Sequence, residues 1–267
     1  MKTIYGTIGY ILFKHSNKEQ YILLLADSHA QLPYCGDSID ISNWFKENMN
    51  KLDLKILLEE IPRVDNDLIF EIFPESEHTQ KLKNLYLGNP SVIHAIDIRS
   101  YLMPYSWEVK NLVSSNETLK EYLVLLEDFF NFKNKQINNY LNYNLNNQLD
   151  EHAELKLNFN NILHKYNEFK KTYEKYMNEQ IIKIDNSILE ETSNIRDMIM
   201  EFLVISKIYK LNNKNIIIHT GLLHANEIFK LLIKYYSYEL KYKSNINYDN
   251  GCTNIPNFIF EKFSHIV

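Results

Sequence analysis

The 267-residue sequence contains few cysteines and no long apolar run. These two features argue against a disulfide-rich secreted protein and against a membrane-spanning protein. Cys35 and Cys252 are too few for a disulfide framework, which favours an intracellular, reducing compartment. No apolar run approaches the roughly 20 residues that cross a bilayer. The apolar N-terminal stretch is not followed by a small-residue cleavage site, as a signal peptide would be. We therefore predict a cytoplasmic protein outside the membrane.

Positive charge is also scarce. The formal net charge is −5, which gives no electrostatic reason to expect a nucleic acid or an anionic membrane as partner. Only three basic residues are arginines, Arg63, Arg99 and Arg196, and the others are lysines, a bias typical of an AT-rich genome. The remaining arginines are therefore candidates for positions where a planar guanidinium is required. The oligomeric state is not indicated.

Glycine and proline are missing from the middle of the chain. There is no glycine between Gly88 and Gly221 and no proline between Pro104 and Pro256. Apolar residues recur there at spacings of three and four, so we predict three or four long helices between about 105 and 212. The Asn-rich piece 138–152 is either a solvated helix or a loop.

Short apolar runs rich in β-formers predict the strands, and several of them are continuous rather than alternating. Continuous runs fit strands that are covered on both faces, as in a parallel sheet. We expect the first two strands to form a hairpin or to be neighbours, and we expect helices over 38–51, 64–86 and 222–237. The predicted strands are 3–15, 21–27, 53–60, 91–98, 215–221 and 238–247.

The predicted fold class is therefore α/β, with a mostly parallel central sheet flanked by helices and a long helical insertion before the last strands. Residues 1–104 and 213–267 would form the α/β core, and residues 105–212 would form the insertion. We expect these parts to make one globular domain.

Ionisable residues follow the predicted strands where each strand ends. The carboxyl ends of parallel strands meet at one edge, where ligands bind in open α/β sheets. Buried charges cost several kcal/mol unless they are paired or bind metal. A convergent cluster of histidines and carboxylates, the composition of a metal or acid–base site, is therefore predicted. Its candidates are Asp27, His29, Glu59, Glu60, Asp97, Arg99, His219 and His224.

Two of these strand ends resemble motifs of the erythromycin esterase, Tiki, TraB and ChaN superfamily. The stretch LLLADSHA resembles its first motif, a strand ending in Gly-Glu-x-His or Gly-x-x-His, with His29 matching. Ala26 and Asp27 replace the glycine and the glutamate. KILLEE resembles the second motif, a strand ending in Glu, which Glu59 or Glu60 matches.

Three later stretches extend this resemblance in the same order along nearly the whole chain. HAIDIRS resembles a Gly-ϕ-Asp strand end, with Asp97 retained and Ala95 in place of the glycine. NIRDMIMEFL resembles an Arg-Asp-x-x-Met helix, which assigns Arg196 and Asp197 to the motif. IIIHTGLLHANEI resembles the final Gly-x-x-His motif, with Gly221 and His224.

The resemblance implies a hydrolase, either esterase-like or protease-like, acting on a small molecule or a peptide. The implied catalytic residues are His29, Glu59, Glu60, Arg196 and His224. Substrate-binding or supporting roles fall to Asp27, Asp97, Arg99, Asp197 and His219. His29, Glu59 and His224 would hold a divalent metal such as Mn, Co, Zn or Fe. Without metal, His29 would act as the general base.

Two further interpretations concern single residues. Gly221 would permit the tight turn from strand to helix. His78, His94, His152, His164 and His265 are assigned to the surface or the core.

A second class of function stays open, because Ala26, Asp27 and Ala95 depart from the superfamily pattern. An inactive binding or structural protein on the same scaffold, for example a component of a larger viral particle, would have a similar sequence.

Overall fold

The structure is a computed structural model that describes residues 1–49, 54–59, 77–97, 153–178, 186–211 and 214–263. The chain divides into two compact units. The first comprises Met1–Asp97 and Val204–Val267, and the second comprises Ile98–Leu203. Each unit is described by itself below.

The first unit is built on a six-stranded sheet of order β6-β5-β7-β3-β2-β8. Strands β6, β5, β7 and β3 are parallel, whereas β2 is antiparallel to both β3 and β8. The predicted α/β class with mostly parallel strands is confirmed, and so is the pairing of the first two strands of the sheet. The strand bounds are β2 (Gly9–His15), β3 (Tyr21–Asp27), β5 (Leu54–Leu58), β6 (Ile93–Ala95), β7 (Asn215–Gly221) and β8 (Tyr238–Lys243).

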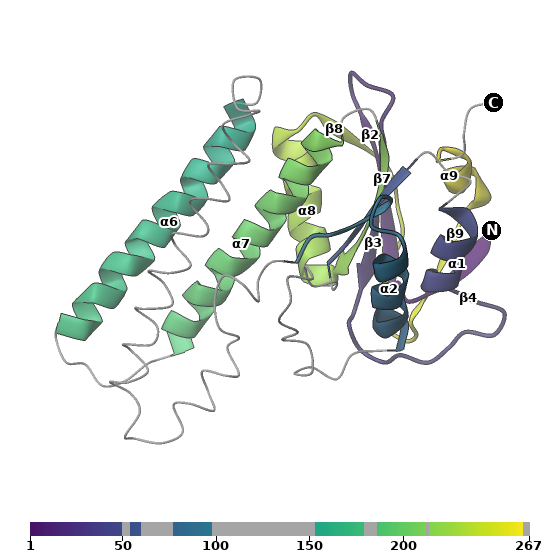
Figure 1. Cartoon of the computed structure of the whole chain (residues 1–267), viewed down its shortest axis with the longest axis horizontal. Helices are drawn as coiled ribbons and strands as arrows, with labels where there is room; N and C mark the ends of the chain where they lie inside the picture. The colour runs from purple at the N-terminus through teal and green to yellow at the C-terminus, as the bar shows by residue number, and fades with distance from the viewer. Residues whose placement is uncertain (50–53, 60–76, 98–152, 179–185, 212–213, 264–267) are drawn as a thin grey trace. The chain divides into compact units, whose positions relative to one another are not determined.

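Helices cover both faces of this sheet, which explains why its central strands are apolar along their whole length. Helices α1 (Ile41–Asn48) and α2 (Glu77–Gly88) lie on one face, and α8 (Leu222–Tyr235) lies on the other (Figure 1). In β3, residues from Ile22 to Asp27 are all buried. Trp44 and Phe45 of α1 share one core with Leu23 and Leu25 of β3.

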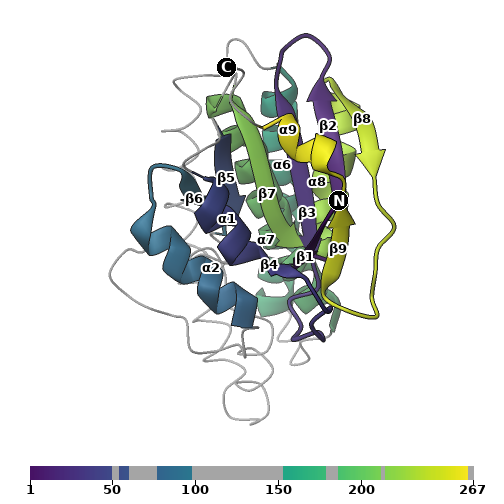
Figure 2. The same cartoon turned by 90° about the vertical axis from the view of Figure 1, so that its right-hand side faces the viewer.

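A second, three-stranded sheet of order β4-β1-β9 lies on the α1 side of the larger one (Figure 2). It consists of β1 (Lys2–Tyr5), β4 (Ile39–Asp40) and β9 (Cys252–Ile255), and β9 is followed by α9 (Asn257–Glu261). The prediction of one strand over 3–15 is wrong. Gly6 has φ +91, a conformation that breaks the strand and sends β1 and β2 into different sheets.

Cys35 and Cys252 form a disulfide across a sequence separation of 217 residues. It joins the loop after β3 to the first residue of β9. The two residues could not be paired from the sequence, because only the folded small sheet brings them together. The sequence analysis favoured a reducing compartment because two cysteines are too few for a disulfide framework. The disulfide between them removes that argument.

The second unit contains helix α6 (Ala153–Asn178) and the larger part of α7 (Asn186–Lys210). Within it, Phe159 and Phe202 place their ring centroids 5.8 Å apart. These helices fall within the predicted helical region. The rest of that prediction, including residues 105–152 with the Asn-rich piece, lies outside the described residues.

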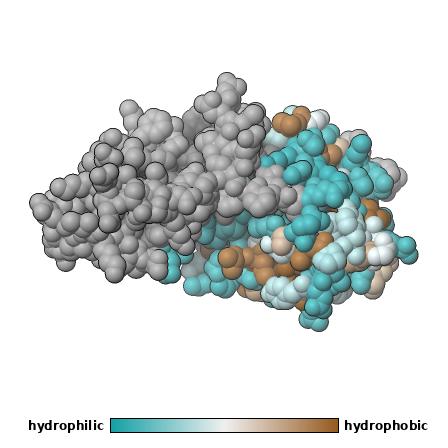
Figure 3. Space-filling view, turned by 90° about the horizontal axis from the view of Figure 1, so that it is seen from below, coloured by the Kyte–Doolittle hydropathy of each residue, from teal (hydrophilic) through white to brown (hydrophobic). Residues whose placement is uncertain are grey.

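The surface of the described residues mixes apolar and polar side chains. Figure 3 shows a brown apolar patch among hydrophilic residues on one face. Single exposed apolar residues such as Leu223, which is 80 % exposed, are normal for a folded protein. No helix among the described residues has the length and apolar character needed to cross a membrane.

His94 on β6 makes stability depend on pH. Burial lowers its pKa to about 4, and the charges of Lys207 and Lys55 act in the same direction. The folded state therefore resists protonation that the unfolded chain accepts, so stability should fall as the pH drops from about 6.5 to about 4. The loss should reach at most about 3 kcal/mol of unfolding free energy. His94→Gln should remove this loss, as measured by melting curves between pH 7 and pH 4.

The control for that series is His164→Gln on α6, since the His164 side chain is 73 % exposed. It should follow the wild type at every pH. Parallel pH profiles for the wild type and His94→Gln would contradict the assignment.

Candidate functional site

Six ionisable side chains gather where β3, β5 and β7 end. Asp27 is the last residue of β3, Glu59 follows β5, and His219 lies near the end of β7. The others come from the loop after β3 and from the first turns of two helices. The six residues are Asp27, His29, Glu59, His78, His219 and His224.

The alternation of side chains along the strands divides these residues between the two faces of the sheet. Leu25, Leu58 and His219 are in register, so they share the face that packs on α1 and α2. Asp27, two residues after Leu25, belongs to the same face. Glu59 follows Leu58 and Thr220 follows His219, so both side chains point to the opposite face of the sheet, which α8 covers. We call Asp27, His78 and His219 the Asp27 cluster, and Glu59, Thr220 and His224 the Glu59 cluster.

In the Glu59 cluster, one fully buried carboxylate collects several donors. Glu59 Oε2 accepts hydrogen bonds from the Thr220 hydroxyl and from the Gly221 backbone N–H. Its other oxygen, Oε1, lies 3.4 Å from His224 Nε2. His224 is on the first turn of α8, so the strand-to-helix junction holds all three of these partners of Glu59. Of the two glutamates left open by the sequence, Glu59 occupies the site, and Glu60 lies outside the described residues.

His29 lies between the two clusters. Its Nδ1 is 3.4 Å from Asp27 Oδ2, and its Nε2 is 3.8 Å from Glu59 Oε2. The His29 side chain is 37 % exposed, whereas both carboxylates are almost fully buried. Its backbone is left-handed, with φ 58, a conformation that is uncommon outside glycine and often found at functional sites. His29 is therefore the member of the group that solvent or a ligand can reach.

Gly221 is required for space and not for a turn, so the sequence-based explanation was wrong. Gly221 has φ −57 and ψ 149, which any residue adopts. A Cβ atom at this position, however, would lie 2.2 Å from His29 Nε2. The missing side chain makes room for the His29 imidazole.

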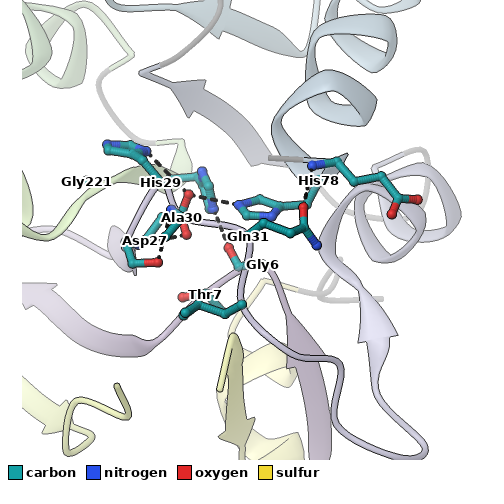
Figure 4. Close-up of polar contacts among 12 residues, drawn as sticks. Gly6, Thr7, Asp27, His29, Ala30, Gln31, His78 and Gly221 are labelled. Carbon is teal, nitrogen blue, oxygen red and sulfur yellow. Dashed lines mark hydrogen bonds and ion pairs between the residues drawn. The ribbon is translucent and has the colours of Figure 1, made fainter. Parts of the chain in front are cut away.

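In the Asp27 cluster, a buried carboxylate is held between imidazoles. His78 Nε2 lies 2.9 Å from Asp27 Oδ2, which also contacts His29 (Figure 4). Burial alone would raise the pKa of Asp27, but the neighbouring imidazoles of His29, His78 and His219 outweigh burial. The pKa of Asp27 is held well below its usual range. Asp27 therefore remains an anion at any pH near neutrality.

The Asp27 cluster also has the composition and spacing of a metal site. Asp27, His78 and His219 are all buried, and each offers a ligand atom within 4.8 Å of the other two. Among the residues that the structure describes, this is the set that meets the spacing. The set expected from the sequence resemblance was His29, Glu59 and His224.

Residues outside the six fix the position of the Asp27 cluster. The Gly6 carbonyl accepts a hydrogen bond from His219 Nε2, at 2.7 Å. Gln31 accepts a hydrogen bond from the Glu77 backbone N–H and donates one to the Tyr5 hydroxyl. Gln31 thereby joins the loop that carries His29 to the start of α2, next to His78.

The remaining predicted residues are placed as follows. Asp97 follows β6 and is half-buried. Arg99 lies outside the described residues, and so does the Arg196 side chain, although position 196 is on α7. Arg196 and Asp197 belong to the second unit, which is not positioned relative to the site.

His78 was missed by the sequence analysis. Its neighbours, SEHTQ, carry no motif, and only the packing of α2 brings it to Asp27.

Comparisons with protein-family models, curated proteins and solved structures find no match to this chain. The functional conclusion therefore depends on the geometry of the site.

Proposed function

We propose that the protein is a hydrolase in which His29 acts as the general base, and that it is a divergent member of the erythromycin esterase and Tiki superfamily. One observation carries the proposal: a partly exposed imidazole lies between two buried carboxylates, 3.4 Å from Asp27 and 3.8 Å from Glu59. An accessible imidazole with oriented carboxylate partners is the usual composition of an acid–base site.

Asp27 and Glu59 would have different roles in this mechanism. Asp27, which stays charged, would accept a hydrogen bond from the Nδ1–H of His29, so that the lone pair is on Nε2. Nε2 then takes a proton from the attacking water. The imidazolium that forms is stabilised by Asp27 and by Glu59, which His224, Thr220 and Gly221 hold in place. Water is the proposed nucleophile, because the sequence around Ser28 has no nucleophile elbow.

The sequence resemblance also assigns a role to Arg196 in this proposal. Its guanidinium would stabilise the developing oxyanion or bind an anionic group of the substrate. Substrates of the proposed class are small esters, amides, phosphoesters or peptides. A divalent metal such as Zn, Co, Mn or Fe, if bound nearby, would supply Lewis-acid assistance.

The variants His29→Asn and His224→Ala test the proposal. Asn tolerates a left-handed backbone, so the first variant removes the imidazole without straining the loop. We expect turnover to fall by about 10²–10⁴-fold in His29→Asn, as for the loss of a general base. His224→Ala should also reduce turnover, because it removes a residue that holds Glu59 in place. The double variant should be hardly worse than either single one, because the residues act as a unit. The assay is a panel of ester, amide, phosphoester and peptide substrates.

Melting curves separate this outcome from a structural role. His29→Asn should lose little stability, because the His29 side chain is 37 % exposed. His224→Ala should also lower the melting temperature, because it removes a buried partner of the Glu59 carboxylate. His164→Gln serves as the matched control and should keep full turnover. If the wild type hydrolyses nothing and both single variants melt several degrees lower in an additive manner, the protein is a binding or structural scaffold.

A further inference from the structure

The Asp27 cluster contains more than the proposed hydrolysis uses. His29 needs one carboxylate at its Nδ1, and Asp27 supplies it. His78 and His219 are two more buried imidazoles next to that carboxylate, and each is only 2 % exposed. Buried imidazoles need hydrogen-bond partners, and these two have them in Asp27 and in the Gly6 carbonyl.

The hydrogen bond of His219 determines its tautomer. A backbone carbonyl only accepts, so Nε2 must donate its proton to the Gly6 oxygen, at 2.7 Å. In the neutral ring, Nδ1 then carries the lone pair. Histidines that bind metals almost always donate their other ring N–H to a carbonyl or a carboxylate in this manner.

Gly6 is shaped to allow this hydrogen bond. Its φ of +91 turns the chain between β1 and β2, and a Cβ there would lie 2.7 Å from Ile41 Cγ2 and 3.2 Å from the His78 ring. A side chain at position 6 would therefore collide with Ile41 and crowd the His78 ring, while the Gly6 carbonyl accepts the hydrogen bond from His219.

His78 donates a hydrogen bond to Asp27, and a metal ion can replace the proton between them. His78 Nε2 is 2.9 Å from Asp27 Oδ2, and the other polar partners of Asp27 are His29 and the Ser28 backbone N–H. A metal ion competes with protons for imidazole and carboxylate ligands, and its binding releases them. Ligand atoms that are within 4.8 Å of one another need to move by only about 1 Å to reach metal–ligand distances of about 2.0–2.2 Å.

We propose that Asp27, His78 and His219 bind one divalent transition-metal ion. Two imidazoles and a carboxylate suit Zn²⁺, Co²⁺ or Fe²⁺ and are a poor match for Ca²⁺ or Mg²⁺, which prefer oxygen ligands. Zn²⁺ and Co²⁺ should bind more tightly than Mn²⁺. Three protein ligands leave a coordination position for water. The proposal does not depend on hydrolysis, because occupancy is measured without substrate.

The experiment is a calorimetric titration of the full-length, chelator-treated protein with Co²⁺, Zn²⁺, Mn²⁺ and Mg²⁺. One equivalent of Co²⁺ or Zn²⁺ should bind and raise the melting temperature. His78→Gln and His219→Gln should each weaken Co²⁺ binding at least 100-fold. His224→Ala from the Glu59 cluster, and the exposed His164→Gln, should stay within about threefold of the wild type.

Two results would overturn the proposal. One is a wild type that binds none of the four ions. The other is a metal that His224→Ala or His29→Asn removes while His78→Gln and His219→Gln retain it, which would place the ion at the set expected from the resemblance. Bound metal without turnover would instead refute only the hydrolase.

A measurement on the wild type covers the case in which a buried histidine variant fails to fold. Proton NMR of the Co²⁺-loaded protein should show a hyperfine-shifted imidazole N–H that exchanges slowly with water. The reason is that the His219 Nε2–H is buried and donates a hydrogen bond to the Gly6 carbonyl. If the ion is held by exposed His29 instead, the shifted ring proton should exchange rapidly with water, and the assignment fails.

Discussion

Gly221→Ala should reduce turnover by about 100-fold while the protein remains folded. The added Cβ would lie 2.2 Å from His29 Nε2, so the imidazole must leave its place between Asp27 and Glu59. A displacement of about 1 Å at a catalytic group costs about 100-fold in rate. The backbone at Gly221 suits alanine, so the loss of stability comes mainly from the contact with His29 and should stay within about 1–3 kcal/mol. Turnover and melting temperature measure the two effects.

The matched control is Gly88→Ala, because a Cβ at Gly88 meets no atom within 4 Å. Its turnover should equal that of the wild type. A double-mutant cycle with His29→Asn isolates the contact between the two residues: once the imidazole is absent, Gly221→Ala should have little further effect on the rate. Unchanged turnover in Gly221→Ala would show that His29 does not act from the observed position.

Reduction of the Cys35–Cys252 disulfide should lower the free energy of unfolding by roughly 2–5 kcal/mol. The bond closes a loop of 217 residues in sequence, and a cross-link over so long a loop strongly limits the freedom of the unfolded chain. At about 2–4 °C per kcal/mol for a chain of roughly this size, the melting temperature should fall by several degrees or more. Melting curves with and without dithiothreitol measure the change.

The double variant Cys35→Ser, Cys252→Ser is the control for this prediction. It should melt like the reduced wild type and should not respond to dithiothreitol. Equal melting temperatures for the oxidised and reduced wild type would show that the disulfide adds no stability. Mass spectrometry of the alkylated protein reports independently whether the thiols are joined.

The sheet was predictable because its signal is local. Strand β7 covers Asn215–Gly221, as predicted, since the apolar run NIII and the glycine mark both of its ends. Strand ends on a parallel sheet also predicted that Asp27, Glu59 and His224 would come from the same edge. The break between β1 and β2 was not predicted, because a glycine in a β-rich run does not reveal whether its φ is positive.

The site was predictable only where its residues follow strands. His78 reaches Asp27 only because α2 packs against the sheet. The first turn of α2 is joined to the His29 loop by Gln31, and no local sequence pattern predicts that contact. The division of the site between two faces also needs the register of three strands. Leu25, Leu58 and His219 lie side by side only after the sheet has formed.

The space that Gly221 leaves for His29 has a consequence for evolution. A chain with a side chain at position 221 cannot hold an imidazole at position 29 in the same place. Relatives that keep the histidine should therefore keep the glycine, and relatives that replace the glycine should also have lost the histidine. This linked pair offers a criterion for recognising distant relatives whose overall sequence similarity has disappeared.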